Sequence, residues 1–373
     1  MADLNYDKFI VRAISASVPP RIRRTEEFVE QLGLEGVEKF IKNVGVKQGH
    51  ISDKNMTTSD LCVHSANKII NELNIERNSI DVLLFVSQTP DYIAPSTACV
   101  IHSRLALSEN CLSYDINLAC SGFVYGISAA LSYISNLEIN RVMFLCGDTV
   151  SKHCSPQDKS LTMLSYDAGS ATLIERSINS ESNGTFKLKT IGNGYRSLIV
   201  PFGGYKHKFG SFERTYREEG VYRNDYDAYM NGADVFKFSI TEVPKLIKEF
   251  YIKNNFDATS FSRCFLHQAN LFIMKNIAKR IGIKEADLPI SIDRFGNTGA
   301  ASIPLTICDY YAKNLANTVS ERIIFCGFGI GLSLGVGMID FKNTVILPVS
   351  ICSESFSDNI ENLHNETSPF INK

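Results

Sequence analysis

The chain has 373 residues, of which 44% are hydrophobic and 21% are charged, and its formal net charge is −2. This length predicts two domains or one duplicated domain, while the small net charge argues against nucleic acid or an anionic membrane as a partner. The chain has no apolar run near the roughly 20 residues that span a bilayer, no signal peptide and no paired cysteine spacing among its ten cysteines, so we expect a cytoplasmic protein with reduced thiols and no metal site.

The first half of the chain alternates strand and helix patterns. Short apolar runs predict strands at residues 9–16, 81–87, 111–116, 141–146 and 165–175. Amphipathic or apolar patterns of helical period predict helices at residues 25–32, 35–43, 58–73, 97–105 and 123–134. We therefore expect residues 1–176 to form one α/β unit.

The middle of the chain is different. Residues 192–229 are rich in Tyr, Arg, Lys and Gly and have weak periodicity, so we expect residues 177–229 to be an excursion that acts as a lid or a partner-facing cap. A second α/β unit follows at residues 230–341. Its expected elements are helices at 235–251 and 271–281, a strand at 262–266, a strand–turn–helix unit at 293–311, and a hairpin of 321–326 with 333–341.

The end of the chain, residues 342–373, is polar and aperiodic apart from residues 345–351. Short polar segments at a chain end bury too little apolar surface to be held in one conformation. We therefore expect a tail that is partly disordered.

Two pairs of strands indicate an internal duplication. Residues 82–88 resemble residues 264–268, and their glutamines are 180 positions apart. Residues 141–147 resemble residues 322–327, and Cys146 and Cys326 are again 180 positions apart. A nearly constant offset predicts two copies of one α/β unit that pack about a pseudo-twofold axis, with equivalent turns meeting at the centre.

Cys120 lies at a junction between a predicted strand and a buried helix. Unpaired N–H groups and the helix dipole gather at such a helix start, and both stabilise a thiolate, the nucleophilic form of cysteine. A buried structural cysteine would give the same local pattern. The duplication adds His267, at a strand end, and Asn297, at the turn equivalent to that of Cys120. A Cys/His/Asn set is suited to acyl transfer through a thioester.

At these residues the sequence resembles the ketoacyl-acyl carrier protein synthase III family, which are condensing enzymes of the thiolase fold. The resemblance runs from about residue 10 to about residue 341. Its most specific motifs are Ala119-Cys120-Ser121-Gly122-Phe123, His267-Gln268-Ala269-Asn270 and Gly296-Asn297-Thr298-Gly299. The resemblance implies an α/β, thiolase-like fold in which two duplicated βαβαβαββ halves pack as a five-layered αβαβα arrangement.

The resemblance also implies a mechanism. Cys120 would accept an acyl group from acyl-CoA or acyl carrier protein, with the N–H groups of Cys120 and Gly331 as the oxyanion hole. His267 and Asn297 would stabilise the enolate formed when malonyl-acyl carrier protein loses CO₂, and the product would be a 3-oxoacyl thioester. This implies no bound cofactor, a homodimer, and a role in fatty acid biosynthesis or in making a specialised lipid, polyketide or surface glycan.

Further site residues follow from the same resemblance. Ala94 and Phe328 are expected at the acyl pocket. The basic helix at 271–281 carries the residues expected to dock the carrier protein, Lys275, Lys279 and Arg280.

Some positions depart from the family pattern. The residues that usually clamp the CoA adenine are replaced by Lys39 and Asn43, and the chain contains no Trp. An arginine that helps to dock the carrier protein is replaced by Phe272, and a bulky aromatic at the acyl pocket is replaced by Ala94. These departures predict a specialised member with a larger acyl pocket.

Two other functions remain open at this point. One is an acyltransferase of the same fold that moves an acyl group onto a small nucleophile without decarboxylation. The other is a non-catalytic partner subunit, in which the cysteine is usually replaced. Release of CO₂ from malonyl-acyl carrier protein distinguishes the condensing enzyme from the acyltransferase, and the presence of Cys120 argues against the partner subunit.

Overall fold

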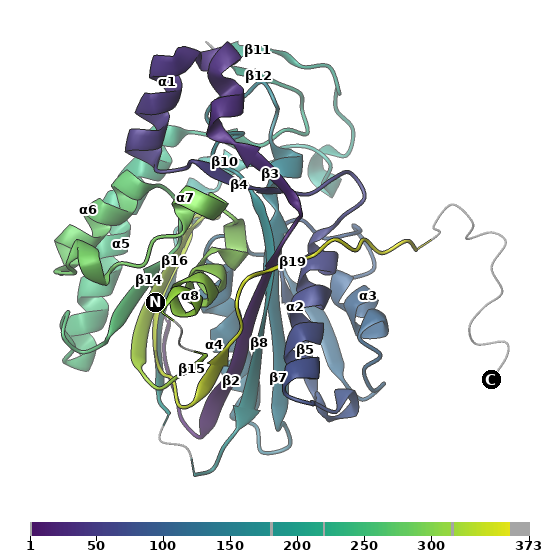
Figure 1. The fold of residues 1–373 in the computed structure, drawn as a ribbon, viewed down its shortest axis with the longest axis vertical. Helices are drawn as coiled ribbons and strands as arrows, with labels where there is room; N and C mark the ends of the chain where they lie inside the picture. The colour runs from purple at the N-terminus through teal and green to yellow at the C-terminus, as the bar shows by residue number, and fades with distance from the viewer. Residues whose placement is uncertain (1, 180–181, 219–220, 315–316, 359–373) are drawn as a thin grey trace, which may run out of the picture.

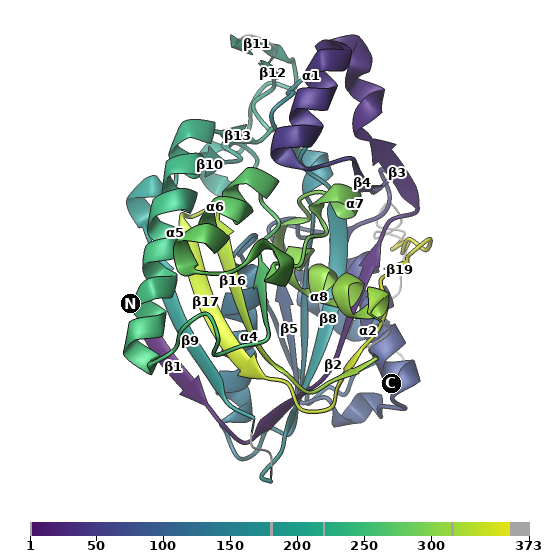
Figure 2. The ribbon, with the colours of Figure 1, turned by 60° about the vertical axis from the view of Figure 1, so that its left-hand side comes forward.

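The computed structural model describes residues 2–179, 182–218, 221–314 and 317–358, which form five layers (Figures 1 and 2). The layers are helices α2 (Thr58–Glu72) and α3 (Thr97–Arg104), a large sheet, helices α4 (Gly122–Ile134) and α8 (Ser302–Lys313), a second sheet, and helices α5 (Gly232–Asn254) and α6 (Leu271–Ile281). This αβαβα order confirms the fold class predicted from the sequence. None of the helices in the described ranges combines the length and apolar character that a bilayer crossing requires.

The large sheet belongs mainly to the first half of the chain. Its strands lie in the order β15 (Thr318–Val319), β18 (Thr344–Ile346), β2 (Phe9–Val18), β8 (Asp167–Arg176), β7 (Arg141–Thr149), β5 (Val82–Val86) and β6 (Leu112–Ile116), and β19 (Ser350–Ile351) also pairs with β2. Strand β5 runs parallel to both β6 and β7, whereas β7–β8 and β8–β2 are antiparallel.

The second sheet repeats this arrangement. Its order is β1 (Ala2–Tyr6), β9 (Gly184–Thr190), β17 (Ser333–Asp340), β16 (Arg322–Gly329) and β14 (Arg263–Leu266). Strand β14 is parallel to β16, whereas β16–β17 and β17–β9 are antiparallel. The series β14–β16–β17–β9 therefore has the directions of β5–β7–β8–β2, and the predicted duplication is confirmed.

The apolar strands are covered on both faces because successive side chains point to opposite sides of a sheet. On β7, Val142 and Phe144 lie in the core cluster that surrounds α4 and α8. The alternate residues Met143 and Leu145 lie in the cluster under α2 and α3. The near-continuous apolar runs in the sequence thus fill two separate cores.

The central core joins the two halves through aromatic contacts. The Phe123 ring on α4 lies 5.3 Å from that of Phe325 on β16, edge to face, and 5.8 Å from that of Phe144 on β7. The Phe325 ring also contacts Phe186 on β9 at 6.0 Å. All four side chains are buried, so this cluster holds α4 between the sheets.

The structure corrects the predicted strand at the start of residues 293–311. A four-residue helix, α7 (Ile292–Phe295), lies there. The side chain of Gln268 accepts hydrogen bonds from the backbone N–H groups of Ser291 and Ile292, at 3.0 and 3.2 Å, and so satisfies the start of this helix. Within the described residues the second half therefore has no counterpart of β6.

The two short helices predicted at residues 25–32 and 35–43 are confirmed: a 3₁₀ turn, Thr25–Phe28, leads into α1 (Val29–Val44), which consists of two helical segments on either side of a kink. Helix α1 is broken at Gly33, whose φ of 72° is in the region that glycine adopts readily. The flanking strands β3 (Arg21–Arg24) and β4 (Gln48–Ile51) pair with each other.

Part of the excursion expected at residues 177–229 is β9 (Gly184–Thr190), a strand of the second sheet. The rest of it contains two small strand pairs. These are β10 (Leu198–Ile199) with β13 (Tyr229–Met230), and β11 (Thr215–Glu218) with β12 (Val221–Arg223). Strands β11 and β12 lie beside α1 at the same end of the molecule in both views (Figures 1 and 2).

The first part of the predicted tail is paired rather than loose. Strands β18 and β19 run parallel to β2, and the backbone N–H of Phe356 donates to the Asp60 carboxylate at 3.0 Å. The rest of the predicted tail, residues 359–373, lies outside the described residues.

Truncation of Phe325 tests the central core. The substitution Phe325→Ala leaves a cavity between α4 and the second sheet, so it should lower the free energy of unfolding by about 3–5 kcal/mol. The control Leu137→Ala, at a side chain that is 80% exposed, should change it by less than about 0.5 kcal/mol. Chemical denaturation measures both, and equal effects would contradict this account of the core.

Candidate active site

A cavity of about 260 Å³ opens between the two halves and contains residues that are far apart in the chain. Cys120, His267, Asn297 and Phe328 all line it. The other lining residues come mainly from α1, α5, α6 and β10: Phe40, Val44, Ser160, Leu164, Leu198, Met230, Gly232, Val235, Phe236, Ser239, Ala269, Asn270, Ile273 and Gly329. The three residues singled out in the sequence thus meet at one mostly apolar cavity.

Cys120 is held by close backbone packing. It lies two residues before α4, and Gly329 of the second half lies against it. A Cβ atom at Gly329 would come within 2.6 Å of Cys120 Cβ and 3.0 Å of its Sγ, so only glycine leaves room for the thiol.

The Cys120 thiol is not a resting thiolate. Burial by the cavity walls, with the negative charge of Asp148 as a second cause, raises its pKa to about 12. The backbone N–H groups of Ile330 and Cys120 act in the opposite direction but do not compensate. The sequence predicted a stabilised thiolate at the start of α4, and the desolvation of the site outweighs that effect.

His267 follows strand β14 and is oriented by α8. Its Nδ1 atom is 2.6 Å from the hydroxyl of Ser302, the first residue of that helix. Burial lowers the pKa of His267 to about 3, so the ring is neutral at pH 7. The Phe328 ring stands edge-on to it at 5.5 Å. If the Ser302 hydroxyl donates to Nδ1, the imidazole proton is on Nε2 and is available to a substrate.

Asn297 is oriented by its own turn. Its side-chain oxygen accepts a hydrogen bond of 3.0 Å from the backbone N–H of Gly299, which leaves the amide NH₂ as the free end. Backbone hydrogen bonds to Leu164 and Tyr166, both 2.9 Å, tie Asn297 to the first half of the chain. Its NH₂ group is therefore a second donor at the same cavity.

Asp148 is a residue that the sequence reasoning missed. It is completely buried at the end of β7, and its carboxylate accepts from the backbone N–H of Gln88 and of Ala300, both at 2.8 Å, and from the Ser87 hydroxyl. Burial raises the pKa of Asp148 to about 7. One carboxylate thus connects the first half to the turn that carries Asn297. The sequence feature that could have revealed Asp148 is a charged residue shortly after the buried strand predicted at residues 141–146.

The glutamine and asparagine of the His267 motif were also assigned no role. Gln268 holds the loop before α7 and donates to the Leu266 carbonyl at 2.9 Å. Asn270 caps α6, since its side chain accepts from the N–H groups of Phe272 and Ile273. Both fix the backbone on either side of His267.

Two other predicted site residues, Ala94 and Gly331, are not among those that line the cavity. Ala94 is exposed and does not line the cavity. Gly331 has a φ of 134° and lies against Ser333, and the N–H that reaches the thiol is that of Ile330.

The three predicted docking residues lie on α6. Lys275 pairs with Glu285 at 2.7 Å, Arg280 donates to the Ile240 carbonyl, and Lys279 is exposed.

This fold and the Cys/His/Asn cavity define a condensing acyltransferase of the thiolase fold. Two family models match, "3-Oxoacyl-[acyl-carrier-protein (ACP)] synthase III" at residues 114–194 and its C-terminal counterpart at residues 252–341. A crystal structure of a 3-oxoacyl-(acyl-carrier protein) synthase from Burkholderia xenovorans superposes with a TM-score of 0.87 and 31% identity, over 94% of this chain and 99% of that one.

Two curated proteins that are similar to this chain have names from the same family. A Campylobacter jejuni protein with the provisional name 3-oxoacyl-[acyl-carrier-protein] synthase 3 is 30% identical over 91% of this chain and 95% of its own length. A beta-ketoacyl-[acyl-carrier-protein] synthase III of Clostridium perfringens is 30% identical over 85% of this chain and 93% of its own length. The chain belongs to the 3-oxoacyl-[acyl-carrier-protein] synthase III family.

Substitution of Asp148 should have two opposite effects. Asp148→Asn replaces one acceptor oxygen with an NH₂ group, so a buried N–H of Gln88 or Ala300 loses its partner, the turn of Asn297 loosens, and turnover should fall about tenfold. At pH 8 the wild-type carboxylate is mostly ionised, so its removal lowers the pKa of the Cys120 thiol. Alkylation of Cys120 by iodoacetamide, followed by mass spectrometry, should therefore become faster.

The matched control is Asp81→Asn. Asp81 also accepts from two backbone N–H groups, those of Asn140 and Arg141, but it lies at the opposite end of β7. The variant Asp81→Asn should therefore leave the rate of Cys120 alkylation unchanged. If Asp148→Asn and the wild type are alkylated at the same rate at pH 8, Asp148 does not act on the thiol.

Proposed function

We propose that this protein catalyses a decarboxylative condensation in the cytoplasm. Cys120 takes an acyl group from acyl-CoA or acyl carrier protein, and malonyl-acyl carrier protein then supplies the two-carbon unit of a 3-oxoacyl thioester. One observation carries this proposal: a single cavity contains the Cys120 thiol, His267 and Asn297. The Ser302 hydroxyl at His267 Nδ1 and the Gly299 N–H at the Asn297 side-chain oxygen leave His267 Nε2 and the Asn297 NH₂ group for a substrate.

The first step forms an acyl-enzyme. Because burial raises the pKa of Cys120 to about 12, the thiol loses its proton as the sulfur attacks the thioester carbonyl. The new C–S bond forms, the donor's C–S bond breaks, and the leaving thiolate takes up the proton. The N–H groups of Cys120 and Gly331 are the proposed donors to the oxyanion, and the N–H of Ile330 stabilises the attacking sulfur.

The second step forms the nucleophile. When the malonyl carboxylate leaves as CO₂, the electron pair of the broken C–C bond moves toward the thioester oxygen and gives an enolate. His267 Nε2–H and the Asn297 NH₂ group donate to that oxygen. The low pKa of His267 matters here, because a neutral ring donates without transferring its proton. The enolate carbon then attacks the acyl-Cys120 carbonyl, the C–S bond to Cys120 breaks, and the released thiolate takes up a proton from water to restore the thiol.

The departures from the family pattern support a specialised acyl donor. Phe272, at the position of a docking arginine, is 53% exposed and stacks on Phe236 at 6.0 Å, at an interplanar angle of 19°. Phe236 lines the cavity. An aromatic pair thus replaces a cation at the cavity mouth, and we propose that Lys275, Lys279 and Arg280 supply the carrier-docking charge instead.

The proposal requires acylation at one cysteine. Cys120→Ala should abolish the acyl mass that intact-protein mass spectrometry detects after incubation with acyl thioesters. His267→Ala and Asn297→Ala should still acquire that mass, but each should release CO₂ from malonyl-acyl carrier protein about 10²–10³ times more slowly, because each removes one donor to the developing charge.

Each variant also has a contradicting outcome. Acylation of Cys120→Ala would remove the assigned nucleophile. Full CO₂ release by His267→Ala or Asn297→Ala would remove their role. Acyl transfer to a small nucleophile by the wild type without CO₂ release would identify the simple acyltransferase instead.

We further propose a homodimer in which Ala94 completes the acyl pocket of the partner subunit. Ala94 is exposed in the single chain, and its neighbour Ile93 is 71% exposed, as expected for a segment that is covered by a second subunit. Phe328 would form the near wall of the pocket, beside His267.

The size of Ala94 should set the preferred chain length. Each extra methylene buried in the pocket contributes about 0.8 kcal/mol, so the wild type should prefer octanoyl over acetyl donors. Ala94→Phe should shift this preference toward acetyl in a competition between the two thioesters, whereas Ala94→Gly should not. A wild type that prefers acetyl, or an Ala94→Phe variant with unchanged selectivity, would contradict this assignment.

A further inference from the structure

The last described part of the chain is bound across the outer helical layer, where Figure 1 shows it in yellow beside α2. We call residues 350–356 the C-terminal strap. After β19, the backbone N–H of Cys352 donates to the Val18 carbonyl at 2.9 Å, and the Cys352 side chain is buried in a small cluster with Met56 and Leu61. The strap lies beyond both family-model matches, the second of which ends at residue 341.

The strap ends on a buried ion pair. The backbone N–H of Phe356 donates to the Asp60 carboxylate at 3.0 Å, and this carboxylate pairs with Arg104 at 2.7 Å. The Phe356 ring covers the same arginine, whose guanidinium carbon lies 4.7 Å from the ring centroid, a cation–π contact. Asp60 is buried, so the strap closes the outer side of a pair that water does not reach freely.

Arg104 also connects to the loop between β5 and α3. Its Nη1 atom donates to the Ser59 hydroxyl at 2.7 Å, and that hydroxyl donates to the Asp91 carboxylate at 2.6 Å. The backbone N–H of Asp91 donates to the Thr97 hydroxyl at 3.0 Å and closes the base of the loop formed by residues 91–97. The strap is therefore joined to this loop by a continuous series of contacts.

The two ends of the loop are anchored in different ways. At the α3 end, the Asp115 carboxylate on β6 accepts from the N–H groups of Thr97 and Ala98, both at 2.7 Å. At the other end, the Asp91 side chain is anchored to α2 through the contacts that lead to the strap. The tip of the loop, with Ile93 and Ala94, is exposed in the single chain. Its position is set by these two anchors.

We infer that the C-terminal strap tunes acyl-donor specificity by positioning the Ala94 loop, with Phe356, Arg104 and Ser59 as the positioning residues. This inference rests on the proposed function, in which Ala94 completes the acyl pocket of the partner subunit. A loop held at a fixed position gives a long acyl chain its full contact area. A loosened loop removes part of that contact and so reduces the discrimination between octanoyl and acetyl donors.

The first test measures donor selectivity. Octanoyl and acetyl thioesters compete for Cys120, and intact mass gives the ratio of the two acyl-enzymes. Phe356→Ala removes the ring from Arg104 and should lower the octanoyl-to-acetyl ratio about threefold or more. Phe356→Tyr retains a ring and should keep the wild-type ratio. So should the control Ser350→Ala, whose hydroxyl contacts β2 rather than Arg104.

The second test measures the loop itself by hydrogen–deuterium exchange, without substrate. Phe356→Ala should speed exchange in peptides that cover residues 91–97, whereas Phe356→Tyr and Ser350→Ala should not. Ser59→Ala breaks the connection one step closer to the loop. Because the two substitutions act on one connection, adding Phe356→Ala to Ser59→Ala should change exchange and selectivity little further.

Three results would overturn the inference: wild-type exchange at residues 91–97 in Phe356→Ala, faster exchange with an unchanged donor ratio, or additive effects of Phe356→Ala and Ser59→Ala. All three leave acyl-Cys120 in place. If instead no donor acylates the wild type at Cys120, the proposed function fails and the specificity role fails with it, while exchange still shows whether the strap holds the loop.

Discussion

A helix that is apolar over most of its surface has to be covered on most sides, and α4 is such a helix: of its residues only Ser132 is exposed. Phe123 faces the first half at Phe144 and the second half at Phe325. Covering α4 therefore requires both sheets, one on each side. The start of α4 then lies at the seam between the halves, which brings Cys120 next to Gly329 of the other half. The position of the nucleophile is a consequence of core packing.

The same burial sets the electrostatics of the site. Removing water keeps His267 neutral and Cys120 protonated, which are the states that a donor ring and an attacking thiol need before substrate binds. Asp148 remains in this dry interior because three donors surround it, two of them backbone N–H groups from different halves. The site therefore combines one buried carboxylate with a structural role, Asp148, and two neutral reactive side chains, Cys120 and His267.

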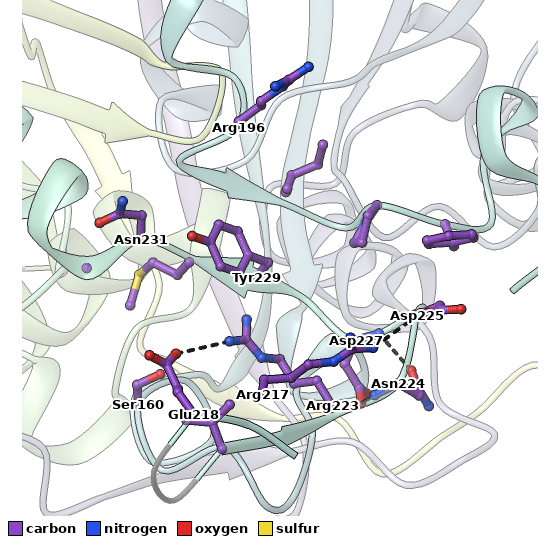
Figure 3. A pocket seen from close by; sticks show the side chains of 16 residues that line it. Ser160, Arg196, Arg217, Glu218, Arg223, Asn224, Asp225, Asp227, Tyr229 and Asn231 are labelled. Atoms are coloured by element: carbon purple, nitrogen blue, oxygen red, sulfur yellow. Dashed lines mark hydrogen bonds and ion pairs between the residues drawn. The ribbon is translucent and has the colours of Figure 1, made fainter. Parts of the chain in front are cut away.

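Much of this architecture could be predicted from the chain alone. The buried strands, the duplication and the motifs around Cys120, His267 and Asn297 depend on local pattern and spacing, which a sequence displays directly. Asp148 was missed because its importance lies in partners 60 and 152 positions away. The strand expected at residues 293–311 was wrong because capping by Gln268, a tertiary contact, favours a short helix. The large cavity lined mainly by residues between Arg196 and Gly232 (Figure 3) could not be predicted, because this part of the sequence has little periodicity.

The bridge made by Asp148 also links chemistry to folding. Its carboxylate has all three of its hydrogen bonds only when the turn at Ala300 has docked beside Ser87 and Gln88. Each sheet could persist after the seam between the sheets opens, but Asn297 and Cys120 would then face solvent separately. Catalytic activity is thus a direct reporter of the docked state. During unfolding it should be lost before the helical circular dichroism signal wherever the halves separate first.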